Sequence, residues 1–210
     1  MHTCLKRAFD LAVSSVLLVM LCPLLIAVTV AIRLGSRGPA IFRQERAGKA
    51  GRPFVFYKFR TMNLEVDPFG PSPKSGDDPR LTRLGKFLRE YSLDELPQLL
   101  NIVKGDMSLV GPRPLYVSQI QEWDERQTTR LLVKPGLTGL AQISGRGGLT
   151  REEKLELDAR YVETATLWLD CRVILSTVAQ VFGRKGIYEE CYSRTEYTRG
   201  KKTPQHEKDQ

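Results

Sequence analysis

Residues 11–32, LAVSSVLLVMLCPLLIAVTVAI, contain no charged side chain. This stretch decides how the rest of the chain is placed relative to a membrane. Its length is about what a single helix needs to cross a bilayer. Pro23 lies near its middle, where the missing N–H and the bulky ring kink a helix. Basic residues flank the stretch on both sides, at Lys6 and Arg7 and again from Arg33 onward, so charge gives no clean in-and-out polarity.

Three membrane arrangements are compatible with this stretch. Hydropathy alone favours a simple transmembrane anchor, because proline is tolerated in spanning helices. A cleaved signal peptide fits less well, since the apolar run is long, is interrupted by Pro23 and is followed by arginines. A re-entrant helix-turn-helix bent at Pro23 would enter and leave the membrane by one face.

The net charge of +8 is concentrated beside the apolar stretch. Residues 33–60 contain eight lysines and arginines but only one acidic residue, Glu45. Each cation close to an anionic leaflet contributes on the order of 1 kcal/mol of attraction. The sequence therefore predicts contact with an anionic phospholipid membrane. Nucleic acid is the rival partner for a basic chain, but we find no nucleic-acid-binding motif and expect no such partner.

The rest of the sequence predicts a mainly helical α+β fold. Residues 40–62 read as two extended segments around a turn with Gly48 and Gly51. Apolar residues at helical spacing predict an amphipathic helix over 81–91 and a long helical region over 151–182. Residues 67–79 are rich in Pro, Gly, Ser and Asp and predict a loop. We expect a membrane segment over 1–36, one compact domain over 37–194, and a disordered polar tail over 195–210.

The most informative short stretch is SLDELP, residues 92–97. Ser92 and Glu95 fit a capping box, which is the ordinary explanation on composition alone. Pro97 favours a helix start near Asp94 instead, because proline is tolerated only in the first turn. Asp94 and Glu95 would then lie at the positive end of a helix, where a carboxylate is stabilised and phosphate is attracted.

Downstream, Gly111-Pro112-Arg113-Pro114 predicts a stiff loop. Pro114 biases Arg113 toward an extended backbone and Pro112 fixes the approach, so the guanidinium has little freedom to lose on binding a phosphate. The alternative is a solvated arginine in a surface turn. The sequence has no glycine-rich nucleotide fingerprint, and its four cysteines show no metal-ligand spacing, which argues against zinc.

The run SLDELPQLLNIVKGDMSLVGPRPL, residues 92–115, resembles the signature of the bacterial sugar transferases, which are small monotopic phosphoglycosyl transferases. The likeness extends over nearly the whole chain. Further matching motifs are KRxxD at 6–10, YKFRTM at 57–62, PGLTG at 135–139, GR at 145–146 and LDARYV at 157–162.

This resemblance implies a reaction and a cofactor. The motif aspartate, Asp94 here, is expected to attack a UDP-sugar and release UMP through a covalent aspartyl intermediate. Glu95 is expected to assist by binding Mg²⁺, and undecaprenyl phosphate is expected to accept the phosphosugar. The resemblance also favours the re-entrant hairpin and a bacterial inner membrane location, with a catalytic domain on the cytoplasmic face.

The resemblance implies further site residues, each with an ordinary alternative. Lys58 is expected near the active centre, although it could be a snorkelling lysine, and Arg89 is expected to face phosphate rather than solvent. The acidic positions could equally be structural helix carboxylates. The candidate substrate-binding and phosphate-binding set is Lys58, Arg89, Arg113, Arg146, Asp158 and Asp170.

A second hypothesis is a membrane-tethered scaffold that recruits glycan-assembly enzymes without catalysis. It would keep the hairpin and the basic belt but would not need Asp94, Glu95, Arg113 and Lys58 together. The sequence does not identify the sugar, and it leaves open whether the chain forms a homo-oligomer.

Overall fold

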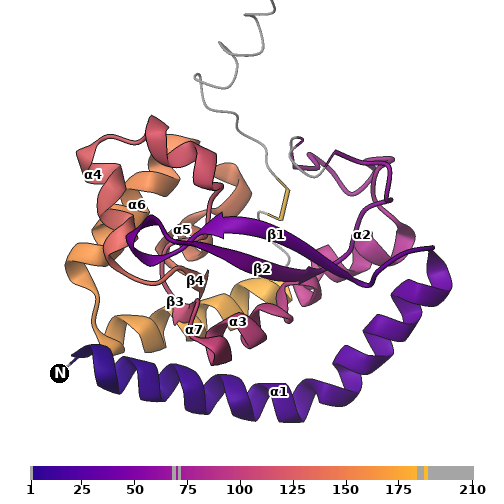
Figure 1. Cartoon of the computed structure of the whole chain (residues 1–210), viewed down its shortest axis with the longest axis horizontal. Coiled ribbons are helices and arrows are strands. Elements are labelled where there is room, and N and C mark those ends of the chain that lie inside the picture. The colour runs from indigo at the N-terminus through magenta and orange to yellow at the C-terminus, as the bar shows by residue number, and fades with distance from the viewer. Residues whose placement is uncertain (1, 68–69, 71, 184–186, 189–210) are drawn as a thin grey trace, which may run out of the picture.

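The computed structural model describes residues 2–67, 70, 72–183 and 187–188, and the predicted tail over 195–210 lies outside them. The described chain is mainly helical with two small sheets, which confirms the predicted α+β class. In Figure 1, α1 (His2–Gly35) runs along one side of the molecule. Helix α3 (Gln98–Lys104) packs against both α1 and the β-hairpin described below (Figure 1), whereas α7 (Leu167–Gly183) packs against the second, parallel sheet.

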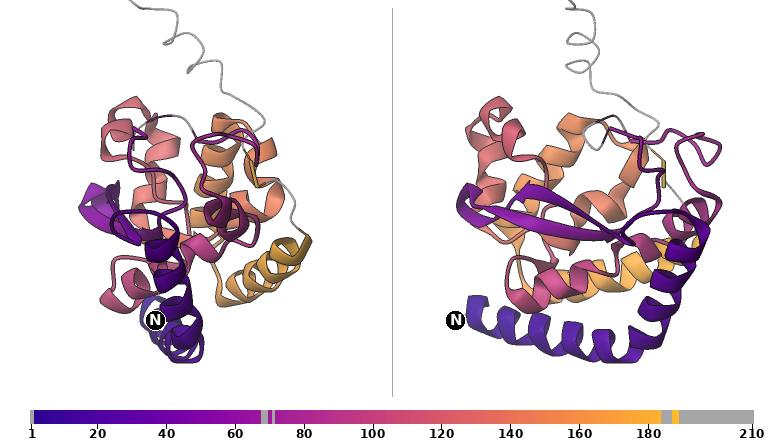
Figure 2. Two further views of the ribbon diagram at one scale, coloured as in Figure 1. Left: turned by 90° about the vertical axis from the view of Figure 1, so that its right-hand side faces the viewer. Right: turned by 45° about the vertical axis from the view of Figure 1, so that its right-hand side comes forward.

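Helix α1 is one continuous helix with Pro23 inside it, rather than two helices joined by a turn as predicted. Figures 1 and 2 show its ribbon changing direction along its length. It is long and apolar enough to cross a membrane. Several large apolar side chains of α1 are exposed; Val19 is 76% exposed and Met20 is 72% exposed. A surface of this kind is normally covered by lipid or by another protein.

The N-terminal part of α1 is tied to the rest of the chain by side chains of the KRxxD motif. Arg7 donates to the carbonyl of Ile102 at 2.5 Å, near the end of α3, where helix carbonyls lack intrahelical partners. The buried carboxylate of Asp10 accepts hydrogen bonds from Ser108 Oγ at 2.7 Å and from the Leu109 N–H at 3.1 Å. These contacts fix α1 against both α3 and the strand that follows it.

The predicted pair of extended segments is confirmed as an antiparallel hairpin. Strands β1 (Ile41–Ala47) and β2 (Pro53–Phe59) pair along their full length and are joined by a turn over Lys49–Gly51. Asn101 of α3 docks β2, because its amide accepts from the Tyr57 N–H at 3.1 Å and donates to the Val55 carbonyl at 2.7 Å. This docking places Lys58, which follows Tyr57, beside the start of α3.

The second sheet is the parallel pair β3 (Ser108–Val110) and β4 (Gly136–Thr138). The Gly111 N–H donates to the Thr138 carbonyl and the Gly136 N–H donates to the Pro112 carbonyl, both at 2.9 Å. These two backbone hydrogen bonds therefore attach the start of the Gly111–Pro114 loop to β4. Beneath this sheet lies the main core, which includes Leu99, Ile102, Met107, Val110, Tyr161 and Val173.

The helical predictions are partly confirmed. Helix α2 (Arg83–Glu90) forms as predicted, with Thr82 as its cap and Leu88 fully buried. The single long region predicted over 151–182 is wrong, because α6 (Arg151–Thr164) and α7 are separate helices. Short helices α4 (Glu125–Thr128) and α5 (Leu140–Ser144) also form. The described part of 67–79 contains neither helix nor strand, in agreement with the predicted loop.

Candidate active site

The two adjacent acidic residues lie in a tight turn before α3. Residues Leu93–Glu95 form a short 3-10 turn, and Ser92 precedes them in the left-handed region, with φ of 54°. Such a backbone is uncommon for a residue with a side chain and persists where the surroundings enforce it. The capping box is absent, since the Ser92 side chain makes no cap hydrogen bond. The predicted helical start near Asp94 is confirmed only as this 3-10 turn, because the α-helix itself begins at Gln98 with Pro97 as its N-cap.

Asp94 is a buried carboxylate, only 7% exposed. Neither of its side-chain oxygens takes part in a hydrogen bond or a salt bridge within the described residues. Burial raises the pKa of Asp94 to about 6, and the neighbouring charge of Glu95 acts in the same direction. Three cations oppose this effect and favour the ionised form, in order of influence Lys58, Arg89 and Arg113. The result is a poorly solvated carboxylate that is ionised at pH 7.

Glu95 is held by Arg113 in a two-pronged contact. Arg113 Nη2 lies 2.6 Å from Glu95 Oε1, and Nη1 lies 3.3 Å from Oε2. Although burial acts to raise the pKa of Glu95, the Arg113 guanidinium holds it below its usual value. The predicted loop arginine is therefore brought to the predicted acidic pair. A fork of this geometry is what arginine offers to carboxylate and phosphate oxygens.

Lys58 and Arg89 complete the charge around Asp94. Burial lowers the pKa of Lys58 to about 8, and the positive charge of Arg89 lowers it further, while Asp94 acts in the opposite direction. Arg89 Nε donates to Thr61 Oγ1 at 3.0 Å, so α2 meets the segment that follows β2 at this point. The structure thus brings both predicted cations to the acidic pair, in place of the solvated positions that were the alternative.

Arg146 contacts the residue that precedes the acidic turn. Its Nη2 donates to Ser92 Oγ at 3.0 Å, and its backbone also adopts a positive φ, of 50°. Burial lowers the pKa of Arg146, while the charge of Glu95 raises it. Arg146 therefore belongs to the same cluster and supports the left-handed residue that presents Asp94.

The two other predicted acidic residues do not contact Asp94 or Glu95, although burial raises the pKa of Asp158 and Arg113 lies close enough to lower it against that effect. Asp158 is 3% exposed and pairs with Arg130 at 2.8 Å. Asp170 is 2% exposed, pairs with Lys6 at 2.5 Å, and accepts from the Tyr161 hydroxyl at 2.7 Å. These contacts favour the alternative that both are structural helix carboxylates.

Sequence reasoning missed two residues that support the site. Thr61 lies within the YKFRTM motif, but nothing in the sequence showed that its hydroxyl would receive Arg89. Arg130 was not singled out, and it donates to the backbone carbonyl of Arg113 at 2.5 Å. Both contacts join residues far apart in sequence, so no local pattern reveals them.

The acidic pair provides suitable donors for a magnesium ion. Mg²⁺ takes one or two carboxylates together with phosphate oxygens and water. The described residues contain no group of three or more His, Cys, Asp or Glu that would form a complete protein cage. Glu95 Oε2, at 3.3 Å from Arg113, is its less tightly held oxygen. Asp94 and Glu95 therefore fit an ion that draws its other ligands from a substrate diphosphate.

The arrangement has the chemistry of a phosphoryl-transfer site. A buried carboxylate, a group that can act as a nucleophile, lies among cations that could neutralise charge on phosphate oxygens. Lys58, Arg89, Arg113 and Arg146 come from four different segments, and all four act on the charge of the acidic pair.

Comparison with known proteins agrees with this chemistry. The model of the family described as "Bacterial sugar transferase" matches residues 1–184. An uncharacterized sugar transferase of Bacillus subtilis is 44% identical over 185 residues, covering 88% of this chain and 91% of the relative. A UDP-glucose:undecaprenyl-phosphate glucose-1-phosphate transferase of Caulobacter vibrioides is 43% identical over 196 residues, covering 87% and 72%.

An Escherichia coli relative has the same printed name as the Caulobacter one and is 40% identical over 192 residues. The alignment covers 88% of this chain but only 41% of that relative, so the chain spans less than half of the longer protein. The family resemblance predicted from the motifs is confirmed. With a family match over most of its length and relatives above 40% identity, the chain belongs to the bacterial sugar transferase family.

Proposed function

We propose that the chain transfers a sugar phosphate from a UDP-sugar to undecaprenyl phosphate, with release of UMP, and so starts the assembly of a lipid-linked glycan. The observation that carries this proposal is the buried carboxylate of Asp94, which has no hydrogen-bond partner in the described chain and faces three cations. The names of the Caulobacter and Escherichia relatives, both glucose-1-phosphate transferases acting on undecaprenyl phosphate, support the substrate classes.

In the first step, an Asp94 oxygen attacks the sugar-proximal phosphorus of the UDP-sugar. The bond from that phosphorus to the bridging oxygen breaks, and UMP leaves with the bonding electron pair. Burial strips water from the Asp94 carboxylate, which leaves its charge available for attack. The product is an aspartyl phosphosugar, and the bond between the sugar's anomeric carbon and its oxygen stays intact.

The cations around Asp94 stabilise charge as it moves from the nucleophile to the leaving group. Lys58 and Arg89 lie on the β2 and α2 side, and Arg113 is fixed by its loop, so all three are in place before substrate arrives. Magnesium held by Glu95, with Asp94 beside it, would neutralise diphosphate charge when bound. Arg146 keeps the Ser92 turn in the conformation that presents Asp94.

In the second step, a phosphate oxygen of undecaprenyl phosphate attacks the phosphorus of the aspartyl intermediate. The bond to Asp94 breaks, the carboxylate is regenerated, and a diphosphate-linked sugar is released into the membrane. Because UMP leaves and a covalent intermediate remains before the lipid reacts, the kinetics should be ping-pong.

The membrane arrangement proposed here is a re-entrant α1. Residues 1–36 would enter the inner membrane from the cytoplasmic side and return, and residues 37–194 would form the catalytic domain on its surface. The change of direction of α1 in Figures 1 and 2 and the tie between its N-terminal part and α3 support this arrangement. The cations that follow α1 would face the anionic lipid head groups.

Cysteine labelling from one side of the membrane tests the re-entrant arrangement. Cys4 near the start of α1 and a cysteine introduced at Ser36 just beyond its end should both react with an impermeant reagent added to the cytoplasmic face. Each would be tested as the sole cysteine in the chain. Labelling of the two positions from opposite faces would show a spanning helix and overturn the proposal.

Release of UMP tests the proposed activity. Purified protein in detergent should release UMP repeatedly from at least one of a panel of UDP-sugars only when Mg²⁺ and undecaprenyl phosphate are present; without the lipid, at most one UMP per protein molecule should appear. Glucose, galactose, N-acetylglucosamine and modified amino sugars belong in the panel, because the site described here concerns phosphate chemistry. Absence of UMP release with every sugar would favour the scaffold hypothesis.

A further inference from the structure

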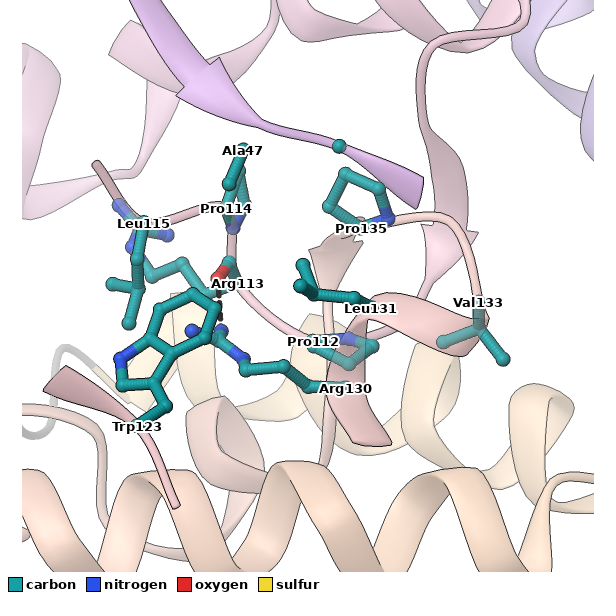
Figure 3. A pocket seen from close by; sticks show the side chains of 11 residues that line it. Ala47, Pro112, Arg113, Pro114, Leu115, Trp123, Arg130, Leu131, Val133 and Pro135 are labelled. Carbon is teal, nitrogen blue, oxygen red and sulfur yellow. Dashed lines mark hydrogen bonds between the residues drawn. The ribbon is translucent and has the colours of Figure 1, made fainter. Parts of the chain in front are cut away.

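Arg130 is a buried cation in contact with the backbone of the loop that bears Arg113. Its side chain is 3% exposed, and Nη2 donates both to the Arg113 carbonyl at 2.5 Å and to Asp158 Oδ2 at 2.8 Å. Figure 3 shows the Arg130 guanidinium beneath that carbonyl, with the indole of Trp123 against it. Arg130 Cζ lies 4.8 Å from the centre of the Trp123 ring, which stacks the cation on its face.

This contact controls the remaining freedom of the loop. Pro112 and Pro114 fix their own φ angles, and Pro114 restricts Arg113 to extended conformations. Within that extended range, rotation about ψ of Arg113 still changes the direction of its carbonyl relative to its side chain. The Gly136 N–H already holds the Pro112 carbonyl at 2.9 Å, so Arg130 holds the next carbonyl along the chain. Together the two contacts set the direction in which the Arg113 side chain leaves the backbone.

That side chain reaches directly into the acidic pair. Arg113 contacts Glu95 at 2.6 and 3.3 Å, while its backbone is held from the other side by Arg130. A buried ion pair such as Arg130 with Asp158 is often no more stabilising than apolar residues of the same volume. Stability alone therefore does not explain why this pair, from two separate segments, lies beneath this one carbonyl.

We propose that Arg130 is a positioning residue for phosphosugar transfer, which acts by fixing the backbone of Arg113, and that Asp158 serves the reaction by orienting Arg130. This inference rests on the proposed function for the reaction that Arg113 assists. It gives Asp158 a role that requires no contact with phosphate.

The test replaces the buried pair with apolar residues so that no charge is left unpaired. The double variant Arg130→Met, Asp158→Leu should fold with a melting temperature near that of the wild type. Its kcat for UMP release should fall by about 100-fold, because small displacements of a charge-stabilising group are costly. Its KM for the UDP-sugar should change little. Arg130→Lys, which keeps the charge but loses the planar fork, should recover part of the kcat.

A double-mutant cycle that combines Arg113→Ala with the Arg130→Met, Asp158→Leu pair separates positioning of Arg113 from a general structural effect. Once Arg113 is truncated, adding the Arg130→Met, Asp158→Leu pair should cost no more than about twofold, because both changes remove the same interaction. The matched control is Arg126→Ala. It breaks exposed ion pairs between Arg126 of α4 and Glu156 and Glu163 of α6, the helix that also bears Asp158, and it should leave kcat unchanged. A folded double variant with normal kcat, or losses that multiply in the cycle, would overturn the inference.

A structural readout keeps this inference distinct from the proposed function. In a crystal structure of the apolar double variant, the Arg113 to Glu95 contact should be broken or displaced. An unchanged contact there would also overturn the inference, whether or not the wild type turns over any sugar nucleotide. Absence of UMP release by the wild type itself would count against the proposed function alone.

Discussion

Asp94→Asn is expected to abolish transfer, lowering kcat by about 10³-fold or more, because an amide cannot act as the nucleophile. No radiolabel from a UDP-sugar should remain bound to this variant when lipid acceptor is omitted, whereas the wild type should retain label. Asp77→Asn is the matched control, since Asp77 is 91% exposed in a turn and pairs only with Lys86 among the described residues. Label that persists in Asp94→Asn would show that another group is the nucleophile.

The same variant should be more stable than the wild type at neutral pH. In the folded protein the pKa of Asp94 is raised from its ordinary 3.8 to about 6, chiefly by burial. A raised pKa adds stability below pH 3.8, and that stability is lost as pH rises through about 6. The shift of the pKa from 3.8 to about 6 corresponds to about 3 kcal/mol of stability lost at pH 7. This value is the upper bound on the increase in the free energy of unfolding when Asn removes the charge. The difference in melting temperature between variant and wild type should therefore grow between pH 4 and 7.

Gly136→Ala is expected to lower the free energy of unfolding by about 3 kcal/mol, and to reduce activity with it. A Cβ at Gly136 would overlap the Gly111 N–H and the Thr138 carbonyl, and would lie 2.6 Å from the Gly111 carbonyl oxygen. These neighbours are backbone atoms, so they cannot rotate away. Strands β3 and β4 would have to separate, and the Arg113 loop would move with β3.

Chemical denaturation and UMP release measured on the same sample test this expectation. Gly148→Ala is the control, because an added Cβ there meets no heavy atom within 4 Å. That variant should match the wild type in both measurements. A Gly136→Ala protein with unchanged stability would mean that the β3 and β4 backbones do not approach each other as closely as described.

Local sequence patterns were enough to predict those helices and strands whose conformation depends on residues close together in the chain. Two extended segments around a turn with Gly48 and Gly51 predicted the β1–β2 hairpin, and helical spacing predicted α2, because each signal comes from residues close together in the chain. The acidic pair and Arg113 were also predicted from the sequence. Their contact, 18 residues apart, needed the structure, because it depends on how β3 pairs with β4.

Other features depend on tertiary contacts that override local signals. Ser92 and Glu95 have the spacing of a capping box, but Arg146 takes the Ser92 hydroxyl and the residue adopts a left-handed backbone. The break between α6 and α7 carries neither glycine nor proline at 165–166, so no standard breaker marks it. For Asp158, sequence shows an acidic residue but cannot show that its partner is Arg130.

The attachment of α1 through Lys6, Arg7 and Asp10 limits how this protein can be handled. Trimming the first ten residues to ease purification would leave Asp170 without its lysine and the β3 backbone without its buried acceptor. Shortened variants meant to be soluble without detergent should therefore retain these first ten residues and replace only the exposed apolar side chains that follow them in α1.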